Sequence, residues 1–181
     1  WYEKALLTAD ANIRTEGILL QKSKGKRVVH NPGFWLAYGN ALEASRRSDG
    51  VVSPLDCFRE AYKLDPLLPL VNEKLARYED DSAKKLQFLR REVTYNPTNA
   101  DAFFNLGNLY GKMGEYDEAL DAYRSSLKIQ PGATDAMINT AIIELTKKEN
   151  CLEASRWAHK ILVLSPSHRR AIEILKKCGT G

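Results

Sequence analysis

The sequence predicts an all-α protein, an α-solenoid of helix–turn–helix repeats with a C-terminal capping helix. Prolines recur at intervals of 34, 31, 34 and 35 residues, at Pro32, Pro66, Pro97, Pro131 and Pro166. Each interval holds enough apolar, helix-forming sequence for two short helices and little that alternates as a strand does. A repeat of this length is typical of a solenoid, because one such unit cannot bury its apolar face alone and needs its neighbours to form a core.

The composition is that of a globular protein. Of the 181 residues, 44% are hydrophobic and 28% charged, which shows no bias towards disorder. The net charge of +4 favours solubility and is a weak indication of nucleic-acid binding. The longest apolar runs are only a few residues, too short for a membrane span.

The cysteines indicate a compartment. Cys57, Cys151 and Cys178 are odd in number and far apart in sequence. They predict neither a disulfide framework nor a paired-cysteine metal site. We therefore expect an intracellular, reducing compartment, with the cytoplasm favoured over an organelle interior.

Residues 1–32 are expected to form a helical segment followed by a basic linker. The first twelve residues have the spacing of the second helix of a preceding repeat, and the linker includes Lys22–Arg27. The chain starts at Trp1 with no charged-then-apolar leader. Either a leader has been removed or the chain is a segment of a longer protein.

Two repeats are expected between residues 33 and 97. In residues 33–66, Trp35, Tyr38, Gly39 and Leu42 fall on one face of a first helix, and the following turn, with Asp49-Gly50 and Pro54, is lengthened. Residues 67–97 form a degenerate, shorter repeat, in which Leu75-Ala76 stands where residues 98–131 have Leu106-Gly107.

Residues 98–131 form the clearest repeat. Phe103, Leu106, Gly107 and Tyr110 lie on one helix face, and Thr98 or Asn99 can cap the helix start. A glycine inside a helix costs about 1 kcal/mol relative to alanine, so Gly107 indicates close approach of a neighbouring helix. Gly114 can take the positive φ at which the helix ends. The second helix buries four residues and ends at a proline: Ala119, Tyr123, Ser126, Leu127 and Pro131.

The chain is expected to close with one more repeat and a cap. Residues 132–166 keep Met137, Ala141, Ala154 and Ala158 but have no glycine at the places of Gly107 and Gly114. Residues 167–181 form an amphipathic helix and tail, whose polar back suits the exposed end of an array.

The clearest repeat resembles the tetratricopeptide repeat. The resemblance is carried by Phe103-x-x-Leu106-Gly107-x-x-Tyr110, followed by Gly114, Tyr116, Ala119, Tyr123 and Pro131. It implies a concave groove, lined by the first helices, that receives a peptide or a helix. The groove residues are then Asn40, Asp101, Phe104, Asn105, Asn108, Lys112, Asp135, Ile138, Asn139 and Ile142.

Asparagines recur on this face. Asn105 and Asn139 are 34 residues apart and hold equivalent places, as do Asn40 and Asn108. Because an amide both donates and accepts, a ladder of asparagines can hold an extended backbone. The alternative is that these are solvated surface residues.

The heat-shock adaptor role known in this family is disfavoured. Such adaptors hold a terminal carboxylate with lysines and an arginine, and the corresponding places here have Leu36, Phe104, Asp135 and Asn139. A groove with Asp101 and Asp135 repels a terminal carboxylate.

No catalytic residues, metal ligands or cofactors are predicted. His30, His159 and His168 have no partner at ligand spacing, and the glycines do not form a phosphate loop. We therefore expect a non-enzymatic scaffold or subunit of a multi-protein complex that binds a protein segment. Paired basic residues such as Arg90-Arg91 leave an RNA-processing helical-repeat factor as an alternative, although nucleic acid is disfavoured because aromatic residues interleave with them poorly. A third alternative is the recognition arm of a larger enzyme.

Overall fold

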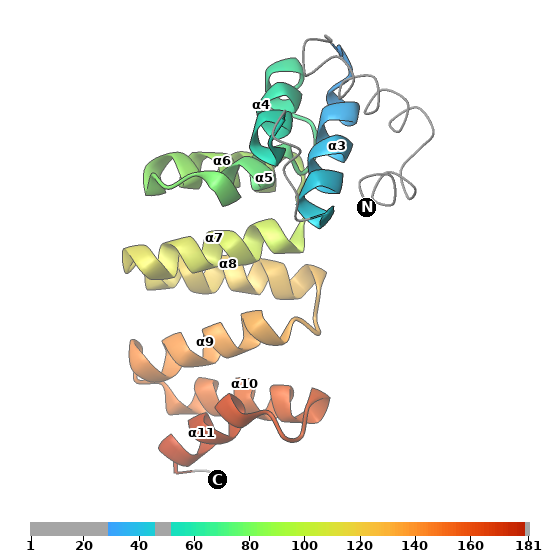
Figure 1. Ribbon diagram of the computed structural model, residues 1–181. Coiled ribbons are helices and arrows are strands. Elements are labelled where there is room, and N and C mark those ends of the chain that lie inside the picture. The colour runs from blue at the N-terminus through green and yellow to red at the C-terminus, as the bar shows by residue number, and fades with distance from the viewer. Residues whose placement is uncertain (1–28, 46–51, 180–181) are drawn as a thin grey trace. The chain divides into compact units, whose positions relative to one another are not determined.

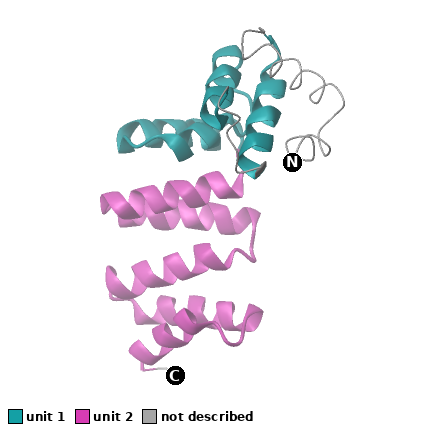
Figure 2. Ribbon diagram, viewed as in Figure 1, with its two compact units in different colours: residues 1–96 teal, residues 97–181 magenta. Residues whose placement is uncertain are grey.

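The computed structural model describes residues 29–45 and 52–179, and these residues form helices and no strand (Figure 1). The chain divides into two compact units, residues 1–96 and residues 97–181 (Figure 2). The expected tail of a preceding repeat, the linker up to Val28 and the Asp49-Gly50 turn lie outside the described residues. Each unit is described by itself below.

The helices follow one another as pairs joined by short turns. Unit 1 contains α3 (Pro32–Ser45), α4 (Pro54–Leu64), α5 (Val71–Tyr78) and α6 (Ser82–Tyr95). Unit 2 contains α7 (Ala100–Met113), α8 (Tyr116–Ile129), α9 (Thr134–Thr146), α10 (Cys151–Leu164) and α11 (Arg169–Lys177).

Unit 1 is built on the contact between α3 and α4. The predicted apolar face of α3 is buried, with Trp35, Tyr38 and Leu42 between 1% and 7% exposed. The sequence placed Pro54 in the turn, and this was wrong. Pro54 is the first residue of α4, where its missing N–H costs nothing, and Ser53 and Asp56 form a capping box around it.

Unit 2 opens with the helix pair of the clearest repeat. A Cβ atom added to Gly107 would lie 2.6 Å from Cε1 of Tyr123, so α7 and α8 pack too closely for any side chain at this position. This confirms the predicted reason for a glycine within the helix. The left-handed Gly114, at φ 83°, ends α7 as predicted. The predicted second-helix face is also confirmed, since Ala119, Tyr123 and Leu127 are buried.

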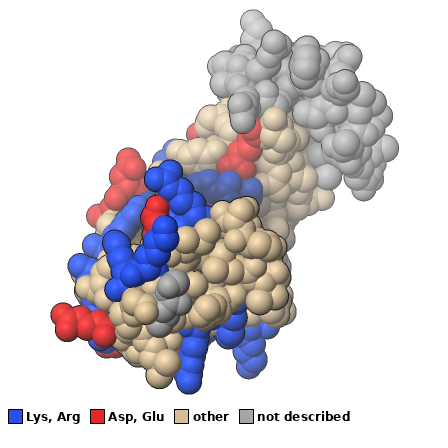
Figure 3. Space-filling view, turned by 90° about the horizontal axis from the view of Figure 1, so that it is seen from below, with Lys and Arg blue, Asp and Glu red and all other residues tan. Residues whose placement is uncertain are grey.

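The C-terminal part of unit 2 packs α10 on α9 and α11 on α10. Helix α11 buries Ala171, Ile174 and Leu175 and leaves Arg169 and Lys177 exposed, as expected of an amphipathic cap. Figure 3 shows the molecule from below. On the face seen there, Lys and Arg side chains gather in one part, beside a broad area without charged groups. No helix in the described part of the chain is long and apolar enough to cross a membrane.

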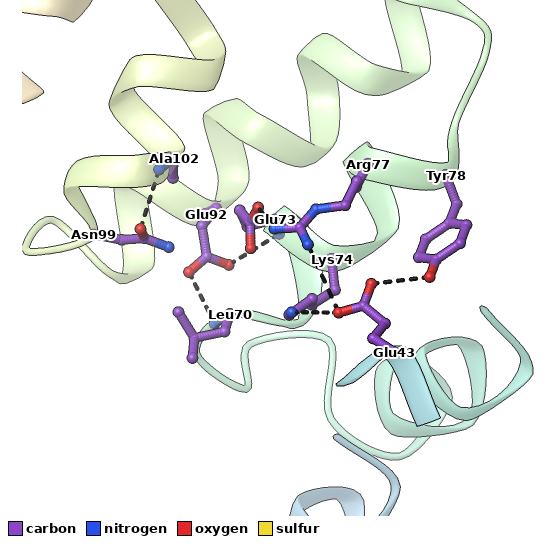
Figure 4. Close-up of polar contacts among 9 residues, drawn as sticks. All are labelled: Glu43, Leu70, Glu73, Lys74, Arg77, Tyr78, Glu92, Asn99 and Ala102. Atoms are coloured by element: carbon purple, nitrogen blue, oxygen red, sulfur yellow. Dashed lines mark hydrogen bonds and ion pairs between the residues drawn. The ribbon is translucent and has the colours of Figure 1, made fainter. Parts of the chain in front are cut away.

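Two helix starts are capped in different ways (Figure 4). Helix α7 has a local cap, because Asn99 Oδ1 accepts a hydrogen bond from the backbone N–H of Ala102 at 3.0 Å. Helix α5 has Leu70 as its N-cap residue, with a φ of 74° and no side-chain cap hydrogen bond of its own. The carboxylate of Glu92, on α6 and only 1% exposed, accepts from the N–H of Leu70 at 2.8 Å. The sequence-distant Glu92 therefore satisfies an N–H group at the start of α5.

Candidate functional site

A pocket of about 440 Å³ lies in unit 2 between α7, α9 and the start of α8. Polar, aromatic and aliphatic side chains line it, with two lysines and no carboxylate among them: Asn108, Gly111, Lys112, Tyr116, Tyr123, Asn139, Ile142, Ile143, Thr146 and Lys147. The first helices of two successive pairs thus face one pocket. This arrangement can receive a ligand that touches both helices.

Three side chains form a hydrogen-bonded cluster in this pocket. The Tyr123 hydroxyl donates to Asn108 Oδ1 at 2.7 Å, and Asn139 Nδ2 donates to the same oxygen at 2.9 Å. Burial raises the pKa of Tyr123, partly offset by its hydrogen bond with Asn139, so the phenol is a firm donor at neutral pH. The bond between Asn108 and Asn139 connects α7 with α9 and orients both amides.

The cluster leaves one donor group and one acceptor for a ligand. Within the described residues, the Nδ2 group of Asn108 and the Oδ1 atom of Asn139 form no hydrogen bond. One residue of an extended peptide presents one backbone carbonyl and one backbone N–H. The two amides can therefore satisfy one peptide residue at both of its backbone groups.

Lysines lie at one end of the pocket, where α7 and α9 end. Nζ of Lys147 lies 5.3 Å from the ring centroid of Tyr116. Neither Lys112 nor Lys147 forms an ion pair with the described part of the chain, whereas the neighbouring Lys148 pairs with Asp117 at 2.5 Å. The two unpaired ammonium groups make this end of the pocket positive.

The structure brings together four of the ten predicted groove residues: Asn108, Lys112, Asn139 and Ile142. Asp101 and Asp135 are exposed in the first turns of α7 and α9. Phe104 packs on Tyr123, with ring centroids 5.9 Å apart.

Three predicted groove residues lie elsewhere. Ile138 is 2% exposed and belongs to the core, so its assignment to the groove was wrong. It directly precedes Asn139, and adjacent helix positions point about 100° apart. Asn40 lies in unit 1. Asn105 does not line the pocket, and the partner of Asn139 is Asn108, one turn further along α7.

Sequence reasoning missed several residues that line the pocket, chiefly Gly111, Tyr123 and Lys147. Tyr123 was assigned to the core, and its ring does pack there at 3% exposure, but its hydroxyl reaches the pocket cluster. The available signal was the hydroxyl itself, since a buried tyrosine normally has a hydrogen-bond partner.

The corresponding space in unit 1 is filled by the protein's own side chains (Figure 4). Glu43 of α3 accepts hydrogen bonds from Nζ of Lys74 at 2.7 Å and from the Tyr78 hydroxyl at 2.9 Å. Burial acts to raise the pKa of Glu43, but these hydrogen bonds and the charges of Lys74 and Arg77 bring it below its ordinary value. Burial and the bond to Glu43 raise the pKa of Tyr78 to about 12.

In the described residues, no three His, Cys, Asp or Glu side chains are grouped so that they could hold a metal ion. All three cysteines carry free thiols, although a hydrogen bond with Cys178 and some burial raise the pKa of Cys151. This contact is not predictable from the sequence, because the two thiols are 27 residues apart and meet only through the packing of α11 on α10.

Within each unit the helix pairs pack one on the next, which defines an α-helical repeat protein of the all-α solenoid class. Residues 100–132, which form α7, α8 and the turn after them, match the family model of the tetratricopeptide repeat. This match confirms the tetratricopeptide repeat that the resemblance implied for this part of the chain.

The chain is also similar to a curated protein and to solved structures. Over 106 residues the chain is 32% identical to Protein bimA of Emericella nidulans, a match that covers 56% of this chain and 12% of that protein. The chain therefore spans about one eighth of the length of this relative. MamA from Desulfovibrio magneticus RS-1 has a similar fold, with a TM-score of 0.65 at 14% identity over 87% of this chain and 96% of that one.

A second solved structure is similar as well. YrrB, described as a TPR protein with an unusual peptide-binding site, has a TM-score of 0.52 at 17% identity over 88% of this chain and 96% of that one. These likenesses confirm the predicted fold class.

Proposed function

We propose that this protein is a non-catalytic interaction scaffold, or a subunit of a larger assembly, that binds an extended segment of another protein in the pocket of unit 2. The observation that carries the proposal is the bonded pair of amides from α7 and α9. Together they offer one donor group and one acceptor beside an apolar wall that includes Ile142. An extended backbone needs this combination, and a neighbouring side chain can pack on the wall.

The fixed orientation of the two amides also supports a peptide ligand. Asn108 is oriented by a buried hydroxyl and Asn139 by Asn108, so little side-chain freedom is lost when a ligand binds. Solvated surface asparagines have no such partners. The description of YrrB as a protein with a peptide-binding site gives further support by analogy.

The test is selection of ligands for the intact chain from a displayed library of random heptapeptides. Fluorescence polarisation would then measure the affinity of selected peptides. The double variant Asn108→Ala and Asn139→Ala should weaken binding at least about tenfold, because two hydrogen bonds are lost. The control is Asp121→Ala, an exposed position on α8 whose side chain does not line the pocket. Circular dichroism would check that each variant is folded.

Two results would reject the proposal. One is a library that yields no peptide above the background of the support alone. The other is selected peptides whose affinity is the same for the double variant and for wild type.

A further inference from the structure

The two units treat equivalent spaces differently. The contact between Gly39 and Phe58 in unit 1 corresponds to the contact between Gly107 and Tyr123 in unit 2, since an added Cβ would lie 2.5 Å and 2.6 Å from the respective rings. Counting four residues onward from each glycine makes Glu43 the counterpart of Gly111. The first helices of the following pairs, α5 and α9, correspond in the same way. Lys74 precedes Ala76 by two residues, as Asn139 precedes Ala141.

In unit 1 this space holds a carboxylate. Glu43 reaches from α3 to α5, where its carboxylate bonds Lys74 and Tyr78 and lies 3.7 Å from Nη1 of Arg77. Its side chain is only 18% exposed. A carboxylate between the first helices of two successive pairs is thus a stable arrangement in this protein.

In unit 2 the same place is open. A Cβ atom added to Gly111 would meet nothing within 4 Å. The pocket around Gly111 includes Lys112 and Lys147, which are not paired with any carboxylate in the described residues, and its lining holds no acidic group. The cations are present, and the carboxylate that they could bind is not part of this unit.

We propose that this pocket accepts an aspartate or glutamate side chain of the docked segment, in the place that Glu43 fills in unit 1. The proposal rests on the function proposed above and adds the chemistry of the partner. Lys112 and Lys147 attract the acidic side chain while Asn108 and Asn139 hold the backbone beside it.

The first turns of the same helices give the segment a direction. Asp101 lies eleven residues before Lys112, which is about 16 Å along α7, and Asp135 lies in the first turn of α9. These exposed carboxylates disfavour an acidic residue at that end. The acidic side chain therefore lies over the ends of α7 and α9, and this geometry differs from capture of a terminal carboxylate.

The first experiment needs no ligand. Glutamate and glutamine have similar helix propensities, so Gly111→Glu and Gly111→Gln differ chiefly in charge. If the space suits a carboxylate, the Glu variant should melt about 2–4 °C above the Gln variant at pH 7. Pairing with lysine favours the ionised carboxyl and lowers its pKa. The advantage should therefore be lost as the pH falls below about 4.

The matched control repeats this comparison in a chain that also carries Lys112→Met and Lys147→Met. There the Glu variant should have no advantage over the Gln variant. Equal melting temperatures for Glu and Gln in the otherwise wild-type chain would overturn the inference and leave the proposed function standing.

The second experiment uses the peptides selected from the heptapeptide library. They should be enriched in Asp or Glu at one position, and Lys147→Met should weaken their binding about threefold to tenfold. Lys148→Met serves as the control, because Lys148 already pairs with Asp117. Selected peptides without acidic residues, or equal effects of the two lysine variants, would overturn the inference, whereas a failure to select any peptide would reject the proposed function itself.

Discussion

The helix pair α3–α4 of unit 1 and the helix pair α7–α8 of unit 2 share one backbone contact and differ in the polar groups around it. In each, a glycine of the first helix lies against an aromatic ring of the second. In unit 2 the ring is Tyr123, whose hydroxyl orients Asn108. In unit 1 the ring is Phe58, and the buried Oδ1 of Asn40, the counterpart of Asn108, has no hydrogen-bond partner among the residues that the structure describes.

The surroundings differ as well. Lys74 lies over the Phe58 ring, 5.6 Å from its centroid, and binds Glu43, so charged groups of the protein fill this side of unit 1. The equivalent side of unit 2 holds neutral amides and an open pocket. The backbone contact therefore sets the packing of each pair. A few side chains beside it determine whether the space is filled by the protein or left for a ligand.

The largest effects are expected at the shared contact. Gly39→Leu and Gly107→Leu should each lower the free energy of unfolding by more than about 3 kcal/mol, because the new side chain overlaps an aromatic ring. Chemical denaturation of the intact chain would measure this. Gly111→Leu is the matched control within α7, where nothing lies in the way, and it should be neutral or stabilising. A similar loss at Gly111 would show that helix packing is not what distinguishes these glycines.

The second largest effect on stability is expected at the caps of α5 and α7, and the two caps should differ. Glu92→Ala should cost about 3 kcal/mol, because it leaves a buried cavity and the Leu70 N–H without its acceptor. Asn99→Ala removes a local cap and should cost only about 1 kcal/mol. Urea denaturation would compare them. Equal costs would contradict the distinction between a buried distant cap and a local one.

A smaller and pH-dependent effect is expected at Glu43. Because its pKa lies below the ordinary value of 4.5, its ionised form stabilises unit 1 above that pH, and this contribution is lost as the pH falls through the lower folded-state value. At pH 7, Glu43→Gln should cost about 1–2 kcal/mol. The difference between wild type and Glu43→Gln should shrink towards pH 3. A difference that is constant with pH would show that packing, not charge, is responsible.

The smallest effect on stability is expected when the types of the two aromatic residues are exchanged, with Phe at position 123 or Tyr at position 58. Tyr123→Phe removes a donor to Asn108 and should cost about 1 kcal/mol. The reverse change, Phe58→Tyr, offers a donor to the unsatisfied Asn40 oxygen and should stabilise by about 0.5–1 kcal/mol. Thermal melting of both variants would measure these changes. Losses at both positions would mean that Asn40 and Asn108 are not in equivalent surroundings.

The packing of each helix pair was predictable because it depends on local rules. Gly107 signalled a close approach, Gly114 a helix end and the spacing of Trp35, Tyr38 and Leu42 a buried face. The candidate site was predictable only in part. Helical spacing predicts Asn108 and Asn139 as groove residues, but it also predicts Ile138, which the core buries.

The sequence by itself determined the all-α class, the helix pairs and the positions where helices touch, because periodicity, capping and the absence of a side chain act within one or two turns of helix. Only the tertiary structure decided that Asn139 bonds Asn108 instead of stacking with Asn105, that Glu92 caps a helix 22 residues away and that Glu43 fills one space while Gly111 leaves its counterpart open. Such contacts depend on the rotation and offset between neighbouring helices, and these are set by the packing of many side chains together.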